Sequence, residues 1–104
     1  MIDLCFPNYE FRIKNRHNKK YIFDLIRKKF ILLTPEEWVR QNCIMFLINE
    51  QKIPKVLINV EKKIKVNNLA KRYDIIVYKP NGSVFLLVEC KSPKVNINQE
   101  TFNQ

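Results

Sequence analysis

The sequence contains one histidine and no apolar run near the length of a membrane span. A spanning helix needs about 20 mostly apolar residues, so we do not expect the chain to cross a bilayer. The first residues, MIDLCFPNYEF, lack the basic segment and long apolar segment of a signal peptide. His17 lies among polar residues in NRHNKK, which is typical of a solvated loop. A histidine-based catalytic triad or a zinc site is therefore not expected.

Cysteines are few, and they show no CxxC or Cys/His spacing. Cys5, Cys43 and Cys90 form no CxxC pair, and an odd number argues against a disulfide scaffold. We also find no internal repeat, linker or low-complexity tract. Together with the missing signal peptide, this predicts a single cytoplasmic domain over residues 1–104.

Positive charge dominates, with 19 Lys and Arg against 10 Asp and Glu and a net charge of +9. Apolar residues make up 46% of the chain and aromatic residues 12%, enough for a core. The charge favours a polyanionic partner, either nucleic acid or an acidic membrane surface. A second interpretation, charge that only keeps the protein in solution, fits the composition equally well.

The residue pattern in the N-terminal third of the chain predicts β-strands. Residues 10–14 and 20–26 alternate around the polar turn NRHN, which lacks glycine, and RKKFILL either extends the second strand or forms a third.

The clearest helix is predicted over residues 34–51, TPEEWVRQNCIMFLINEQ. Thr34 can cap it, Pro35 suits its first position, and Glu37 completes a capping box. We assign Glu37 to capping and the helix dipole. Glu36, one turn before Val39, is expected to point toward whatever the helix packs on.

The second half predicts a strand over residues 55–66 and a hairpin over residues 72–93, RYDIIVYKPNGSVFLLVECKSP. The tail KVNINQETFNQ resembles the start of another helix.

The turn around Asn81 and Gly82 sets the register of this hairpin. A two-residue or four-residue loop pairs Tyr78 with Phe85 and Asp74 with Glu89, and Lys91 then projects from the same face. A three-residue loop would shift the register and separate the carboxylates onto opposite faces.

Facing carboxylates on strands that are apolar on both faces need a compensating charge. Mg²⁺ or Mn²⁺ between Asp74 and Glu89 would provide it, with the backbone carbonyl of Cys90 as a further ligand. Lys91 could then orient or activate an attacking water. The alternative is a surface hairpin with solvated charges, in which Lys91 pairs with Glu89.

Aspartate, a hairpin and then Glu-x-Lys resembles the active-site motif of the PD-(D/E)xK nuclease superfamily. The segments TPEEWVRQ, KRYDIIVY and LLVECKSP, in this order, further resemble small proteins related to the N-terminal nuclease domain of the type I restriction enzyme motor subunit. This resemblance extends from about Tyr9 through Gln104. It departs from the pattern at Tyr73, where proline often stands before the aspartate.

The resemblance implies a restriction-endonuclease-like α/β (α+β) fold, a mixed β-sheet with flanking helices. It also implies an acidic residue of the first core helix near the metal, which maps onto Glu36 and Glu37. A glutamine and a tyrosine would follow on a later helix. Gln104 matches the glutamine and no tyrosine follows, so we expect a nuclease domain that is truncated at its C-terminus.

These observations predict a Mg²⁺-dependent DNA endonuclease with Asp74, Glu89, Lys91 and Glu36 in its catalytic site. The basic positions expected to hold DNA phosphates are Lys62, Lys63, Lys65, Lys71 and Arg72. The alternative function is a non-catalytic nucleic-acid-binding module of the same fold. A third is a structural partner domain, because an incomplete sheet leaves an edge strand open to pairing with a second copy.

Overall fold

The computed structural model describes residues 9–91 and 94–96. The elements follow one another as β1 (Ile13–Arg16), β2 (Lys19–Asp24), β3 (Lys29–Leu32), α1 (Pro35–Asn49), a 3-10 turn η1 (Lys55–Leu57), β4 (Ile58–Val66), β5 (Leu69–Tyr78), β6 (Val84–Lys91) and β7 (Lys94–Asn96). The predicted α+β class is confirmed. The described strand pairs are all antiparallel.

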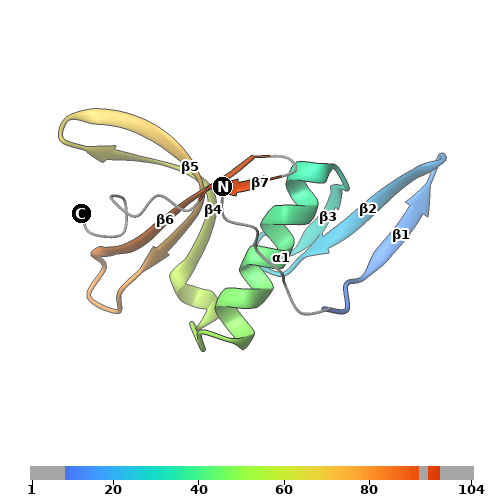
Figure 1. The fold of residues 1–104 in the computed structure, drawn as a ribbon, viewed down its shortest axis with the longest axis horizontal. Coiled ribbons are helices and arrows are strands. Elements are labelled where there is room, and N and C mark those ends of the chain that lie inside the picture. Colours follow the sequence, from blue (N-terminus) through green and yellow to red (C-terminus); the bar gives the residue numbers. More distant parts are fainter. Residues whose placement is uncertain (1–8, 92–93, 97–104) are drawn as a thin grey trace.

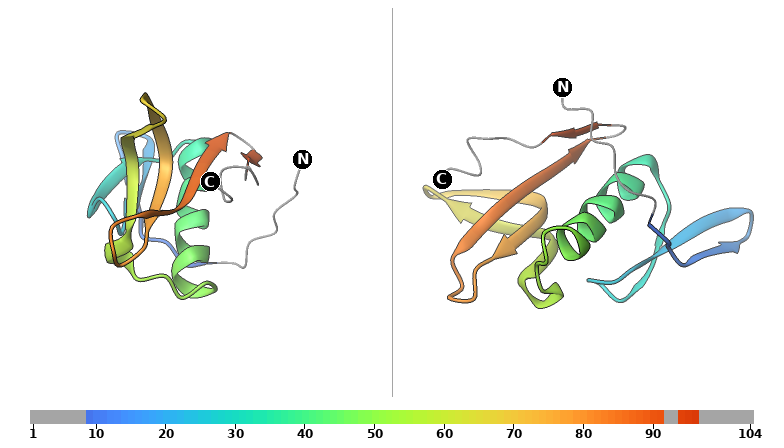
Figure 2. Two further views of the ribbon diagram at one scale, coloured as in Figure 1. Left: turned by 90° about the vertical axis from the view of Figure 1, so that its left-hand side faces the viewer. Right: turned by 60° about the horizontal axis from the view of Figure 1, so that its bottom comes forward.

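The helix lies between two sheets (Figure 1). One sheet has the order β1-β2-β3 and the other the order β4-β5-β6-β7. The two further views show the same arrangement, with the β1–β2 hairpin extending away from the helix (Figure 2). Within the described ranges, no helix is long and apolar enough to cross a membrane.

The N-terminal hairpin forms as predicted, but β1 lies at residues 13–16 and not at 10–14, so the turn is shorter than NRHN. RKKFILL contributes a third strand and does not lengthen the second. His17 and Asn18 make the turn between β1 and β2, with φ values of 51° and 64°. Two successive positive φ values match the twist of a two-residue hairpin, and asparagine tolerates this conformation better than most residues. The missing glycine therefore does not prevent the hairpin.

The predicted helix and its cap are confirmed. The hydroxyl of Thr34 accepts a hydrogen bond of 3.0 Å from the backbone N–H of Glu37, and Pro35 is the first helical residue. The buried side of α1 mixes apolar with polar residues. Its buried members are Glu37, Val39, Arg40, Gln41, Asn42, Cys43, Ile44 and Leu47.

Two apolar clusters cover the two faces of the second sheet. The larger one joins α1 to the sheet through residues such as Ile44, Ile75 and Val88, and the smaller one lies around Tyr73, Ile76 and Leu87. Removing this apolar surface from water is the main contribution to holding the helix on the sheet.

The predicted register of the β5–β6 hairpin is confirmed in its centre, where Ile76 pairs with Leu87 and Ile75 with Val88. The predicted pairing of Tyr78 with Phe85 is wrong. Tyr78 pairs with Val84, because the register shifts by one residue next to the turn. Such a bulge changes the pairing locally and leaves the rest of the ladder intact.

The tail begins with a strand. Lys94–Asn96 forms β7 and pairs with β6, so this part of the predicted helix is wrong. The rest of the tail, including Gln104, lies outside the described residues.

Candidate functional site

An irregularity in β4 and β5 creates the site. Val60 pairs with Ile75 and Lys62 with Tyr73, but no pair forms between Glu61 and Asp74. Glu61 adopts a φ of +53°, which is uncommon for a residue other than glycine. Ile75 faces the helix-side cluster while Tyr73 belongs to the opposite one, so the alternation of the strand is broken here. Glu61 and Asp74 can therefore both extend toward α1.

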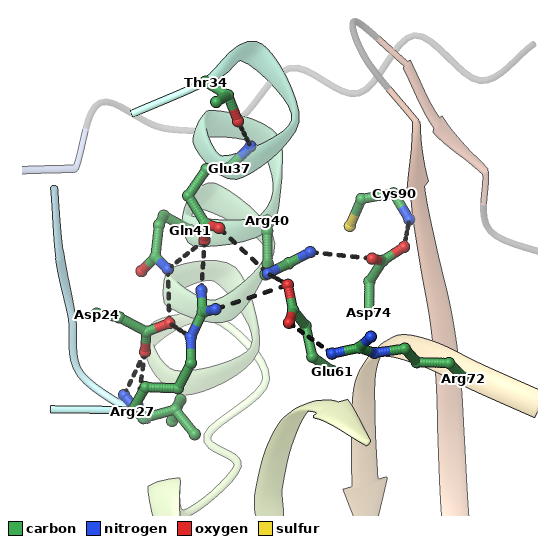
Figure 3. Close-up of polar contacts among 11 residues, drawn as sticks. Asp24, Arg27, Thr34, Glu37, Arg40, Gln41, Glu61, Arg72, Asp74 and Cys90 are labelled. Carbon is green, nitrogen blue, oxygen red and sulfur yellow. Dashed lines mark hydrogen bonds and ion pairs between the residues drawn. The ribbon is translucent and has the colours of Figure 1, made fainter. Parts of the chain in front are cut away.

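Arg40 of α1 connects these carboxylates (Figure 3). Its Nη1 donates to Glu61 at 2.9 Å and to Glu37 at 3.1 Å, and its Nη2 donates to Asp74 at 3.0 Å. The Arg40 side chain is only 8% exposed. Its Nε has no hydrogen-bond partner among the described residues. One buried guanidinium thus bridges three carboxylates from three elements.

A second arginine extends this network to the first sheet. Arg27 donates from Nε to Asp24 at 2.6 Å and from Nη2 to Glu37 at 2.8 Å. Gln41 donates to both of these carboxylates. Asp24 is fully buried and also accepts backbone N–H groups from Ile26 and Arg27, so its charge is stabilised from several directions.

These contacts shift several pKa values. Burial alone would raise the pKa of Asp24, but the hydrogen bonds and charge of Arg27 outweigh it and hold the pKa below its ordinary range. The hydrogen bond from Arg40 lowers the pKa of Glu61. Burial alone would lower the pKa of Arg40, but the neighbouring carboxylates of Glu37, Glu61 and Asp74 outweigh it and raise the pKa above its ordinary value. At Asp24, Glu61 and Arg40 the network therefore favours the charged form of the side chain.

Asp74 also contacts the strand that carries Glu-x-Lys. Its Oδ2 accepts a hydrogen bond of 2.6 Å from the backbone N–H of Cys90, the residue between Glu89 and Lys91. The Cys90 side chain is buried against α1, where a hydrogen bond with Cys43 and burial raise the pKa of its thiol. That thiol is therefore neutral and structural.

The two carboxylates of the predicted metal site have different partners. Asp74 binds Arg40 and the Cys90 amide, whereas Glu89 forms an ion pair of 2.6 Å with Lys71. Glu89 lies between two helix-side residues of β6, Val88 and Cys90, so strand alternation directs it to the opposite face. Lys91 ends β6, and its side chain lies outside the described part of the molecule.

The expected orientation of Glu36 was wrong. Glu36 is exposed, and Glu37 is 6% exposed and belongs to the Arg27 and Arg40 network. Apolar spacing located the stripe of α1 that packs on the second sheet. The β2–β3 turn covers a different, polar side of the helix. Arg27 of this turn forms an ion pair with Glu37.

The predicted phosphate-binding residues lie on β4 and β5 in varied settings. Lys63 and Lys65 are exposed, while Lys62 lies 5.1 Å from the centre of the Tyr78 ring. Lys71 pairs with Glu89 and Arg72 with Glu61. The Glu89 contact raises the pKa of Lys71.

Residues 9–91 and 94–96 contain no group of three or more His, Cys, Asp or Glu that could hold a metal ion. Glu37, Glu61 and Asp74 surround the guanidinium of Arg40 and not a metal-sized site. Arg40 and Glu61 were missed by the sequence reasoning. The spacing of Glu37 and Arg40, three residues apart on a helix, was the available signal.

The chain is thus an α+β domain in which a helix contributes a charged network to the interior of two antiparallel strands, β4 and β5. The family model described as Type I restriction enzyme R protein N terminus (HSDR_N) matches residues 35–104, about two thirds of the chain. The chain belongs to this family. No curated protein and no solved structure matches the sequence significantly.

Proposed function

We propose that this chain is a Mg²⁺-dependent DNA endonuclease domain of restriction-enzyme type that acts in the cytoplasm. The observation that supports it most directly is the 2.6 Å hydrogen bond between Asp74 and the backbone N–H of Cys90. This contact brings the aspartate of the motif against the middle residue of Glu-x-Lys. Asp74 and Cys90, which are 16 residues apart in sequence, are thus neighbours.

The roles follow from the chemistry of each side chain. In this proposal Asp74 and Glu89 bind the metal with the backbone carbonyl of Cys90, and Lys91 orients the attacking water and offsets phosphate charge. The helix carboxylate connected to Asp74 is Glu37, which shares Arg40 with it, and not the exposed Glu36.

The donor atoms suit Mg²⁺ or Mn²⁺, because both ions prefer carboxylate and carbonyl oxygens. Such an ion would lower the pKa of a bound water and neutralise the phosphate. In the structure, however, Asp74 is bound by Arg40 and Glu89 by Lys71. We therefore propose that Asp74 releases Arg40 when the metal site is formed, and that Glu89 releases Lys71 and turns from the opposite face of the sheet toward Asp74.

Cleavage of supercoiled plasmid and of a labelled oligonucleotide, with Mg²⁺ and with EDTA, tests this function. Lys91→Ala should lower the rate by about 100-fold or more, the usual contribution of a positioned proton-transfer group. Lys79→Ala removes an exposed lysine near the hairpin turn and should cleave like the parent. Equal cleavage by the parent and Lys91→Ala would refute the assignment.

A non-catalytic DNA-binding module is the second candidate, and the Arg40–Asp74 bond is the observation that favours it. An internal cation already compensates Asp74 without a metal. This candidate predicts salt-sensitive DNA binding, no cleavage, and no heat on Mg²⁺ titration. Heat of binding that disappears in Asp74→Asn would exclude it.

A further inference from the structure

The first sheet carries most of the excess positive charge and lies outside the family match. Residues 9–34 contain eight Lys and Arg against two Asp and Glu, a net charge of +6 out of +9 for the whole chain. The family match begins at residue 35. The family match therefore gives no account of the charge on this sheet.

The excess cations are exposed and lack acidic partners. Arg27 is the one member that forms ion pairs with described residues. The other seven are exposed, and none of them forms an ion pair with any residue that the structure describes. They are Arg12, Lys14, Arg16, Lys19, Lys20, Lys28 and Lys29. Unpaired cations at this density are the electrostatic footprint of a polyanion.

Strand alternation sorts the residues of this sheet onto two faces. Ile22 and Asp24 are buried on the face toward α1, where Asp24 contacts Gln41. The opposite, outer face combines cations with aromatic rings. The register pairs Lys14 with Tyr21, Arg16 with Lys19, and Phe23 with Phe30 across it.

Contacts between these side chains hold two cations over the rings. The guanidinium of Arg12 lies 4.7 Å from the centre of the Phe23 ring, and Lys14 Nζ lies 4.4 Å from that of Phe30. Phe23 and Phe30 pack edge to face at 5.2 Å. Cation–π contacts restrict the long side chains before any ligand binds, which lowers the entropy cost of binding. Tyr21 is half-buried on the same face.

This face also contains a hollow of about 390 Å³, lined by Lys14, Arg16, His17, Tyr21 and Phe30. Two of these residues are cationic and two are aromatic, with the single histidine at the turn between β1 and β2. The combination suits a ligand that has both negative charge and a flat ring.

We propose that the outer face of the β1-β2-β3 sheet binds single-stranded DNA, with one unpaired base stacked on Tyr21 in this hollow. The phosphates of this DNA strand bind Lys14, Arg16 and the neighbouring cations. A duplex has the same phosphates, but its bases are stacked inside and cannot reach a tyrosine ring. Aromatic side chains in a positively charged groove are the general means of binding single strands. This surface is separate from Asp74 and Glu89 and does not depend on catalysis there.

Fluorescence anisotropy with labelled oligothymidine and with a duplex of equal length tests the proposal. EDTA is present throughout, so that the outcome is independent of metal and cleavage. Tyr21→Leu should weaken single-strand binding roughly tenfold, as removal of one stacked base does, and leave duplex binding unchanged. Tyr21→Phe keeps the ring and should bind like the parent.

The electrostatic part is tested with Arg16→Gln over a range of salt concentrations. This variant should lower the salt slope of single-strand binding by about 0.7, the value for one phosphate contact. Lys79→Gln removes an exposed lysine outside this sheet and should bind with the parent's affinity. Unchanged single-strand binding by Tyr21→Leu, or equal losses in Arg16→Gln and Lys79→Gln, would overturn the proposal.

Discussion

Arg40 donates a hydrogen bond of 3.0 Å to Asp74, and this contact joins the helix to the strand that carries the candidate site. The same guanidinium binds Glu37 and Glu61. Because its side chain is 8% exposed, water cannot replace these contacts at low cost. Arg40 thus stabilises the fold and also occupies the aspartate that the proposed metal requires.

The stability role predicts a large effect of Arg40→Met. The variant leaves three carboxylates without their shared cation, and removal of one member of a buried ionic group costs about 3–5 kcal/mol. Urea unfolding measures this loss. Arg72→Met removes an exposed partner of Glu61 and should cost less than about 1 kcal/mol. Equal losses in both variants would mean that Arg40 is no more important than a surface cation.

Because Arg40 already binds the carboxylate of Asp74, we expect it to compete with a metal ion for that carboxylate. Arg40→Gln should bind Mn²⁺ roughly tenfold more tightly than the parent, because a hydrogen bond to a charged group contributes about 1.5–3 kcal/mol. Isothermal titration calorimetry of folded protein measures the affinity, and Arg72→Gln is the matched control. Weaker Mn²⁺ binding by Arg40→Gln would show that Arg40 supports the metal site instead.

Acid should weaken the fold through Asp24 and Glu61. Their pKa values in the folded protein lie below the ordinary values of 3.8 and 4.5. Their contribution to stability is therefore complete above about pH 5 and is lost as the pH falls through the folded-state values. Urea unfolding of the parent and of Asp24→Asn should differ most near neutral pH, and the difference should shrink toward about pH 2. A constant difference would contradict this account.

The N-terminal cap of α1 predicts a smaller effect. Thr34→Ala removes the oxygen that accepts the N–H of Glu37 and should cost about 1 kcal/mol. Thr34→Ser keeps a hydroxyl and should retain most of the stability in the same thermal melts. A loss in Thr34→Ser as large as that in Thr34→Ala would argue against the cap.

Local signals were sufficient to predict the helix and the hairpins. Thr34 and Pro35 mark the start of α1, and the turn at Asn81 and Gly82 sets the register that pairs Ile76 with Leu87. The pattern of apolar residues identified the strands, and in β2 the alternate residues Ile22 and Asp24 are buried.

The polar network could not be predicted in this way. Its members come from four elements, and only tertiary packing brings Arg27 to Glu37. Glu61 has a positive φ although glutamate does not favour this conformation. Nothing in the sequence therefore indicated that Glu61 and Asp74 both extend toward α1. The interpretation that Asp74 and Glu89 face each other assumed unbroken alternation, which this irregularity removes.

Mn²⁺ binding to the parent, Asp74→Asn and Glu89→Gln tests the proposed site most directly, with free Mn²⁺ measured by electron paramagnetic resonance. The account predicts one site in the parent and affinities at least about tenfold weaker in both variants, since each loses a charged ligand. Lys79→Gln, away from the site, should match the parent. Equal Mn²⁺ binding by the parent and both carboxylate variants would contradict the claim that these two residues form a metal site.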